Sequence, residues 1–99
     1  MSQYKSGDKV YVTGLVKLQE NPTPSKPFIE KQYTEQVTLH EKNQEDGTWS
    51  TKNERGSATS NEKVYETEGE FNEWRTSPQH DTWLTSLKEG RVWYITKYA

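Results

Sequence analysis

The stretch Arg91–Tyr98, with the sequence Arg-Val-Trp-Tyr-Ile-Thr-Lys-Tyr, is the densest apolar run in a very polar chain. Its β-branched and aromatic residues follow one another without a glycine or proline, which favours a β-strand. Successive side chains of a strand point to opposite faces, so Val92 and Tyr94 share one face and Trp93 lies on the other. We expect this strand to run through the middle of a small sheet, with Val92 and Tyr94 in the core and Trp93 on a face available for binding.

A helix is predicted immediately before this strand, over residues 78–89. Ser77 is a suitable N-cap residue, and Pro78 fits the first helical position because its missing N–H would have no partner there. Lys88 near the end suits the helix dipole, and Gly90 stands where a C′ glycine is common. The apolar stripe of this helix would be formed by Trp83, Leu84 and Leu87.

The first half of the chain predicts strands. Apolar and polar residues alternate over residues 9–18, where Gly14 predicts a bulge or a tight bend, and again over residues 33–41. The Asp-Gly pair at 46–47 predicts a hairpin turn that leads into a return strand over residues 48–51. Together with the last strand, these segments indicate a β-rich domain.

Three further segments complete the chain. Residues 19–27 contain three prolines, which favours an extended surface loop, and residues 52–61 are small and polar, which favours a flexible loop. Residues 62–74 alternate as a strand would. On that strand, one face would carry an acidic stripe formed by Glu66, Glu68 and Glu70.

The composition indicates one small folded domain over residues 1–99. Val, Leu, Ile and Phe contribute only 15 of the 99 residues, below the roughly 20% under which disorder is common. The net charge of −2 is small, however, and aromatic residues make up 12% of the chain, so a small aromatic-rich core is expected.

The composition also bounds the function. Without cysteine, the chain has no disulfide, thiolate nucleophile or cysteine metal site, and we expect a cytoplasmic protein. No apolar run reaches the roughly 20 residues that span a membrane, and the balanced charge argues against a nucleic-acid binder that relies on bulk charge. His40 and His80 lack a second histidine at ligand spacing, and no nucleotide-binding or hydrolase motif is present. We therefore expect neither an enzyme nor a bound metal or cofactor.

Residues 15–49 resemble in part a bacterial SH3 (SH3b) domain. The similarity rests on four segments: Leu18-Gln19-Glu20-Asn21-Pro22 after the first strand, Val37-Thr38-Leu39-His40-Glu41 as a central strand, Asp46-Gly47-Thr48-Trp49 as a turn and strand, and Gly90-Arg91-Val92-Trp93 as the closing strand. The resemblance implies a small barrel. It also implies binding to cell-wall peptides or glycans, with Trp49 as a candidate contact.

We therefore predict a mostly β fold with one helix, of the α+β class. The leading architecture is a small SH3-like or partly open antiparallel barrel of about five to six strands, with the helix near residues 78–89 before the last strand. A helix packed on an antiparallel sheet is the alternative.

The predicted function is a non-enzymatic binding module for a protein or peptide, such as an accessory, adaptor or inhibitor protein, including one encoded by a phage or mobile element. Its candidate contacts, which suit a basic partner, are Glu66, Glu68, Glu70, Phe71 and Trp74. A carbohydrate- or cell-wall-binding module that uses Trp49 and Trp93 is the first alternative. The second is a single-stranded nucleic-acid binder that uses Tyr11, Trp93, Lys9, Lys17 and Lys97.

Overall fold

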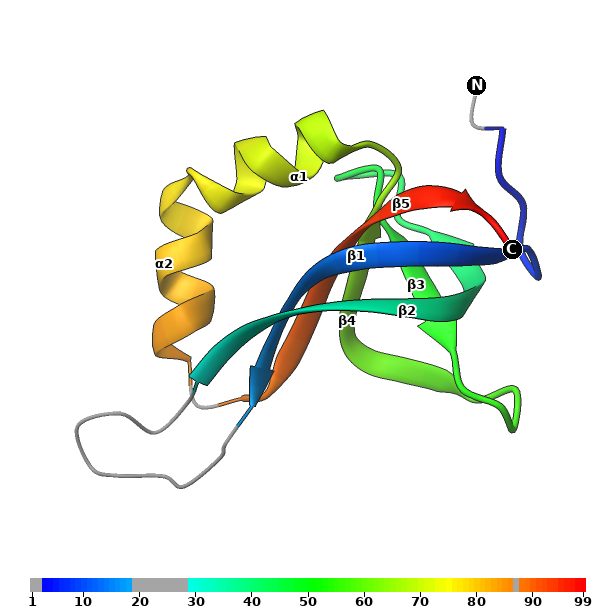
Figure 1. Ribbon diagram of the computed structural model, residues 1–99, viewed down its shortest axis with the longest axis horizontal. Coiled ribbons are helices and arrows are strands. Elements are labelled where there is room, and N and C mark those ends of the chain that lie inside the picture. The colour runs from blue at the N-terminus through cyan, green and yellow to red at the C-terminus, as the bar shows by residue number, and fades with distance from the viewer. Residues whose placement is uncertain (1–2, 19–28, 87) are drawn as a thin grey trace.

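In the part of the chain that the structure describes, the strands form a small β-barrel with two helices on one side (Figure 1). The structure, a computed structural model, describes residues 3–18, 29–86 and 88–99; the predicted proline-rich loop and Leu87 lie outside the described residues. Within the described part, the strands are β1 (Lys9–Leu18), β2 (Ile29–Lys42), β3 (Trp49–Lys52), β4 (Ala58–Tyr65) and β5 (Gly90–Tyr98). The helices are α1 (Glu68–Arg75) and α2 (Pro78–Thr85). The prediction of a mostly β fold is confirmed, whereas the prediction of one helix is wrong.

The strands close into a barrel in the order β1-β2-β3-β4-β5, and β5 returns to β1. Four of the pairs are antiparallel, but β4 and β5 run parallel. Parallel neighbours need a long crossover connection, and α1 and α2 supply it. The prediction of an antiparallel barrel is therefore wrong for one pair of strands, β4 and β5.

The strand over Arg91–Tyr98 is confirmed as part of β5, and its two faces pack on two different clusters. Trp93 and Ile95 face the barrel interior, where Trp93 is fully buried. Val92 and Tyr94 pack on the helix side of the barrel, as predicted. The expectation that Trp93 lies on an accessible face is wrong, because the barrel closes over that face rather than leaving it open to solvent.

Gly14 lies within the continuous strand β1. The pairing of β1 with β5 shifts register between Tyr11 and Val12, before Gly14 is reached. A Cβ atom at Gly14 would lie 2.7 Å from the Cα of Trp93 and closer still to the carbonyl oxygen of Val92. Glycine therefore allows β1 and β5 to approach each other closely beside the buried indole.

The hairpin between β2 and β3 forms at the predicted turn. Gly47 has a φ of 71°, and the N–H of Asn43 donates to the carbonyl of Thr48 over 2.7 Å. Burial raises the pKa of the Asp46 carboxyl, but hydrogen bonds from Thr48 and Lys63 outweigh this effect and hold that pKa below its usual value. The flexible loop predicted over residues 52–61 is shorter than expected, because β4 begins at residue 58.

The segment predicted as an acidic strand over residues 62–74 instead ends β4 and forms α1. Thr67 caps the helix, since its Oγ1 accepts a hydrogen bond from the N–H of Glu70 over 3.2 Å. Phe71 and Trp74, three residues apart, then turn together towards the barrel. In this stretch the alternating pattern predicts a strand, whereas the threonine cap predicts a helix. The burial of two aromatic rings favours the helix.

The second helix begins as predicted, with Ser77 as its N-cap and Pro78 in its first turn, but it ends at Thr85 instead of near Gly90. Its C-terminal end is held by Lys17 of β1. The buried Lys17 ammonium donates hydrogen bonds to the carbonyl oxygens of Trp83 (2.5 Å) and Ser86 (2.8 Å). Burial lowers the pKa of Lys17. A cation distant in sequence thus takes the role expected of Lys88.

Candidate protein-interaction site: the outer edge of β2

The strand β2 is longer than both of its neighbours, β1 and β3. It pairs with β1 from residue 29 to residue 38, but it pairs with β3 only between Thr38 and Lys42. Within the described part of the chain, residues 29–37 therefore have a strand partner on one edge alone (Figure 1). We call the other edge of residues 29–37 the outer edge of β2.

The direction of the backbone groups along this edge follows from the hydrogen bonds of Leu39. Its N–H donates to the carbonyl of Asp8 over 2.9 Å, and its carbonyl accepts from the N–H of Gly7 over 2.8 Å, so both groups point towards β1. The β1–β2 register is regular, and backbone direction alternates along an antiparallel strand. Odd-numbered residues of β2 therefore bond to β1. The even-numbered residues Gln32, Thr34 and Gln36 present their N–H and carbonyl groups to the outer edge.

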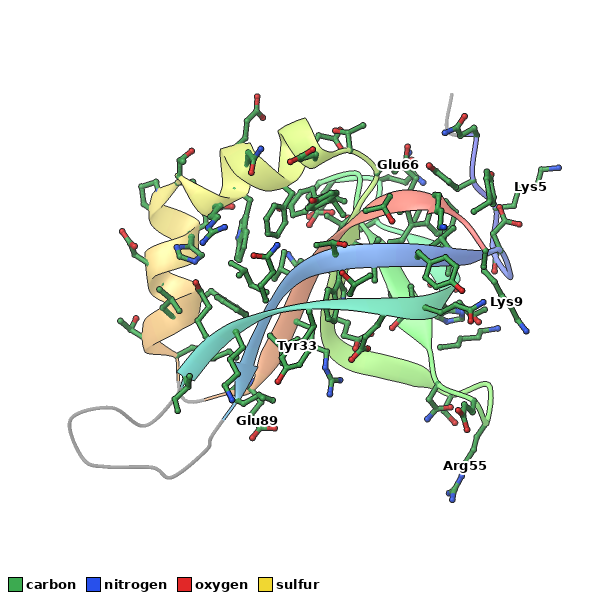
Figure 2. The ribbon with its side chains drawn as sticks, in the orientation of Figure 1. Lys5, Lys9, Tyr33, Arg55, Glu66 and Glu89 are labelled. Atoms are coloured by element: carbon green, nitrogen blue, oxygen red, sulfur yellow. The ribbon has the colours of Figure 1, made fainter. Side chains whose placement is uncertain are left out.

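The side chains of β2 also separate by parity. The odd-numbered residues share a face with Val10 and Val12 of the barrel interior, and Val37 packs against that core. Where β3 no longer covers this face, the side chains emerge into solvent: 38% of Tyr33 and 36% of Ile29 are exposed. Figure 2 shows Tyr33 beside β2, on the side of the strand that lies away from α1.

A polar cleft of about 720 Å³ lies beside the outer edge. β2 forms one wall, the end of β3 and the following turn form another, and single residues of β1, β4 and β5 complete the lining. The residues that give it its character are Glu35, Val37, Lys52, Glu54, Glu62 and Arg91. Because charges of both signs line the cleft, it suits a polar, extended ligand such as a polypeptide backbone more than a strongly charged one.

An ion pair that spans β4 and β5 lines this cleft. The Nη1 atom of Arg91 lies 3.0 Å from Glu62 Oε1, and the Thr51 hydroxyl donates to the other carboxylate oxygen. Only 8% of the Glu62 side chain is exposed, compared with 42% of the Arg91 side chain. Glu62 therefore serves to position Arg91, whose remaining guanidinium N–H groups can bind carbonyl or carboxylate oxygens in the cleft.

The predicted acidic contacts are dispersed by the structure. Glu66 accepts a hydrogen bond from the indole N–H of Trp49 over 2.9 Å and lies 3.0 Å from Lys42 Nζ, so it ties parts of the barrel together. Glu68 and Glu70 lie in the first turn of α1, where negative charge stabilises the helix dipole. A single acidic strand face therefore does not exist.

The predicted aromatic contacts are mostly buried. Phe71 and Trp74 lie between α1 and the barrel, where Phe71 is 3% exposed and Trp74 is 8% exposed. Trp49 and Trp93 are core residues of the barrel, so neither presents a ring surface on which a sugar could stack.

The alternative nucleic-acid face loses two members, because Trp93 and Lys17 are both fully buried. Tyr11 remains exposed, and Lys97 lies over its ring at 5.1 Å. The fifth member, Lys9, shares the exposed face of β1 with Tyr11 and also lines the cleft beside β2.

His80 has a structural environment. Its Nε2 atom lies 2.8 Å from a carboxylate oxygen of Glu30, and its ring packs edge-on against Trp74. The contact with Glu30 ties α2 to β2, and the ring contact with Trp74 ties α2 to α1. Among the described residues, no group of acidic or histidine side chains is arranged to hold a metal ion, and no helix is long and apolar enough to cross a membrane.

Comparison with known proteins adds no relative. No protein-family model, curated protein or solved structure matches this chain.

Proposed function

We propose that this chain is a non-enzymatic protein-interaction module that binds an extended polypeptide segment along the outer edge of β2. The single observation that carries the proposal is the backbone of Gln32, Thr34 and Gln36, which points away from β1 and has no neighbouring strand within the described residues. A peptide that adds a strand here would gain main-chain hydrogen bonds, and the cleft would receive its side chains.

The proposal extends to the class of barrel and the cellular role. An SH3-like description is supported by the small barrel and by the turn at 46–47 that leads into Trp49 and β3. Peptide binding beside a short hairpin suits an adaptor, accessory or inhibitor protein in the cytoplasm, including one encoded by a phage or mobile element.

The experiment uses peptides selected from a displayed random library and maps their contacts by NMR on the full chain. We expect the bound peptides to shift and protect the amides of Gln32, Thr34 and Gln36. Peptides that instead perturb α1, around Glu68 and Glu70, would support the acidic surface and overturn the edge proposal. A library that yields no binder would also count against it.

A matched pair of proline variants tests whether the backbone carries the binding. Gln36→Pro removes an N–H that points outward, so the domain should fold but lose the selected peptides, since proline is tolerated on strand edges. Glu35→Pro removes an N–H that bonds to β1 and should destabilise the domain itself. Equal behaviour of the two variants would contradict the assigned backbone directions.

A further inference from the structure

The odd-numbered side chains of residues 29–37, which lie on the face of β2 that continues the barrel interior, follow a self-complementary order. From residue 29 to residue 37 this face carries, in turn, an apolar, a basic, an aromatic, an acidic and an apolar residue: Ile29, Lys31, Tyr33, Glu35 and Val37. Reversing the chain direction exchanges the basic and acidic positions and leaves the aromatic residue at the centre. We propose that the outer edge of β2 pairs antiparallel with the same edge of a second copy of this chain, with the two-fold axis at Tyr33. This inference rests on the proposed function and names the partner of that site.

The hydrogen-bonding directions agree with this register. An axis at Tyr33 places Gln32 opposite Thr34 of the second copy and Glu30 opposite Gln36 of the second copy. All of these are even-numbered residues, whose backbone groups point to the outer edge. Each such pair would exchange two N–H to carbonyl hydrogen bonds, so the edge would be paired over most of its length.

The odd-numbered residues then face each other in the closer, non-hydrogen-bonded positions, where side chains interact most strongly. Lys31 lies opposite Glu35 of the second copy, and symmetry repeats this ion pair. Tyr33 meets its own symmetry mate at the centre. Ile29 lies opposite Val37 at each end of the paired segment.

Other registers with the same backbone parity lack this match. Moving the axis by one residue towards Gln32 places Tyr33 opposite Lys31 and Glu35 opposite Ile29. Moving it towards Thr34 places Tyr33 opposite Glu35 and Lys31 opposite Val37. Both shifts separate the opposite charges, so the charge pattern selects the axis at Tyr33.

The surroundings of the edge support a second copy as the occupant. Tyr33 and Ile29 are two of the four large hydrophobic residues that the described surface exposes, and the pairing would cover both. The cleft lined by Val37, Lys52 and Glu54 leaves room for Ile29 of the second copy opposite Val37. Lys31 has a contact within its own chain, but an ammonium group carries three donors, so the intermolecular pair requires no loss of that contact.

Sedimentation over a concentration series tests the inference with charge reversals. Wild-type protein should shift with concentration from 11.6 kDa towards twice that mass. Lys31→Glu alone and Glu35→Lys alone each bring like charges opposite each other and should remain monomeric. An equimolar mixture of the two single variants should associate, since each supplies the charge that the other lacks. The double reversal Lys31→Glu with Glu35→Lys should also dimerise.

Circular dichroism spectra that match the wild type would show that the variants fold. If either variant fails to fold, Gln36→Pro replaces it and should be monomeric. Wild-type protein that stays at 11.6 kDa would overturn self-pairing, as would dimers that all variants form equally. In the first case, peptides that still protect Thr34 would leave the proposed function standing; peptides that leave it unprotected would remove both.

Discussion

Adding one methyl group at Gly14 should destabilise the protein more than adding it at any other described glycine whose contacts are known. The new carbon of Gly14→Ala would lie 2.7 Å from the Cα of Trp93, whereas ordinary contacts begin near 3.4 Å. The backbone of β5 would have to retreat by at least about 0.7 Å at Trp93, and by more at the carbonyl oxygen of Val92, which the new carbon would approach more closely still. Trp93 resists that movement because it is fully buried and lies opposite Val64 on the parallel seam.

Overpacking of a core costs about 1–3 kcal/mol, and a clash between backbone atoms belongs at the upper end, so we expect a loss of about 3 kcal/mol. For a domain of this size, such a loss lowers the melting temperature by on the order of 12–24 °C. Thermal and urea unfolding, followed by circular dichroism and by tryptophan fluorescence, measure both quantities.

Two other alanine substitutions provide matched controls. Gly69→Ala lies in α1 with its nearest neighbour, Thr67 Oγ1, at 3.9 Å, so it should stabilise the protein by roughly 0.5–1 kcal/mol through helix propensity. Gly47→Ala meets no atom within 4 Å but keeps a φ of 71°, so it should cost about 1–2 kcal/mol. If Gly14→Ala is no worse than Gly47→Ala, the close approach of β1 and β5 is refuted.

Substitutions at three further positions test the N-cap of α1 and two charged groups. Thr67→Ala should cost about 1 kcal/mol through loss of the α1 N-cap, and Thr67→Ser should restore most of it in urea unfolding. Burial depresses the pKa of Lys17, so wild-type stability should rise with pH between the folded pKa and the unfolded value near 10.5, and Lys17→Met should lack this rise in a pH series of melting curves. The lowered pKa of Asp46 stabilises the fold above about pH 3.9, and this contribution is lost as the pH falls through the pKa of the folded state. The melting temperature of Asp46→Asn should therefore fall less steeply with decreasing pH than that of the wild type. An unchanged pH dependence would exclude this role of Asp46.

Local patterns in the sequence predict those elements whose contacts are themselves local. The alternation in Arg91–Tyr98 predicts β5, and the Asp-Gly pair at 46–47 predicts the hairpin turn. The Ser77-Pro78 pair predicts where α2 begins. In each case, the residues that form the element also supply its signal.

The missed features depend on residues that are distant in sequence. The end of α2 is set by Lys17, which lies 66 residues before Trp83, so no pattern near the helix reveals it. The segment after Tyr65 satisfies a strand pattern and a capped helix equally well until Phe71 has a surface to pack against.

The outer edge of β2 could be predicted only in part. Alternation over residues 33–41 predicts a strand, and the order of charges from Lys31 to Glu35 is visible in the sequence. The point at which β3 stops pairing, at Thr38, depends on how the barrel closes. An edge is a property of the whole sheet, so a strand's own residues do not identify it.

Amide hydrogen exchange along β2 measures whether the outer edge of β2 is open in the monomer and paired between two copies. In dilute protein, the amides of Tyr33 and Glu35 should exchange slowly because they bond to β1, whereas those of Thr34 and Gln36 should exchange rapidly. At high concentration, Thr34 and Gln36 should become protected as second copies add to the edge. Slow exchange of the Thr34 and Gln36 amides in dilute protein would show that the edge is not open, and fast exchange at every concentration would show that two copies do not pair there.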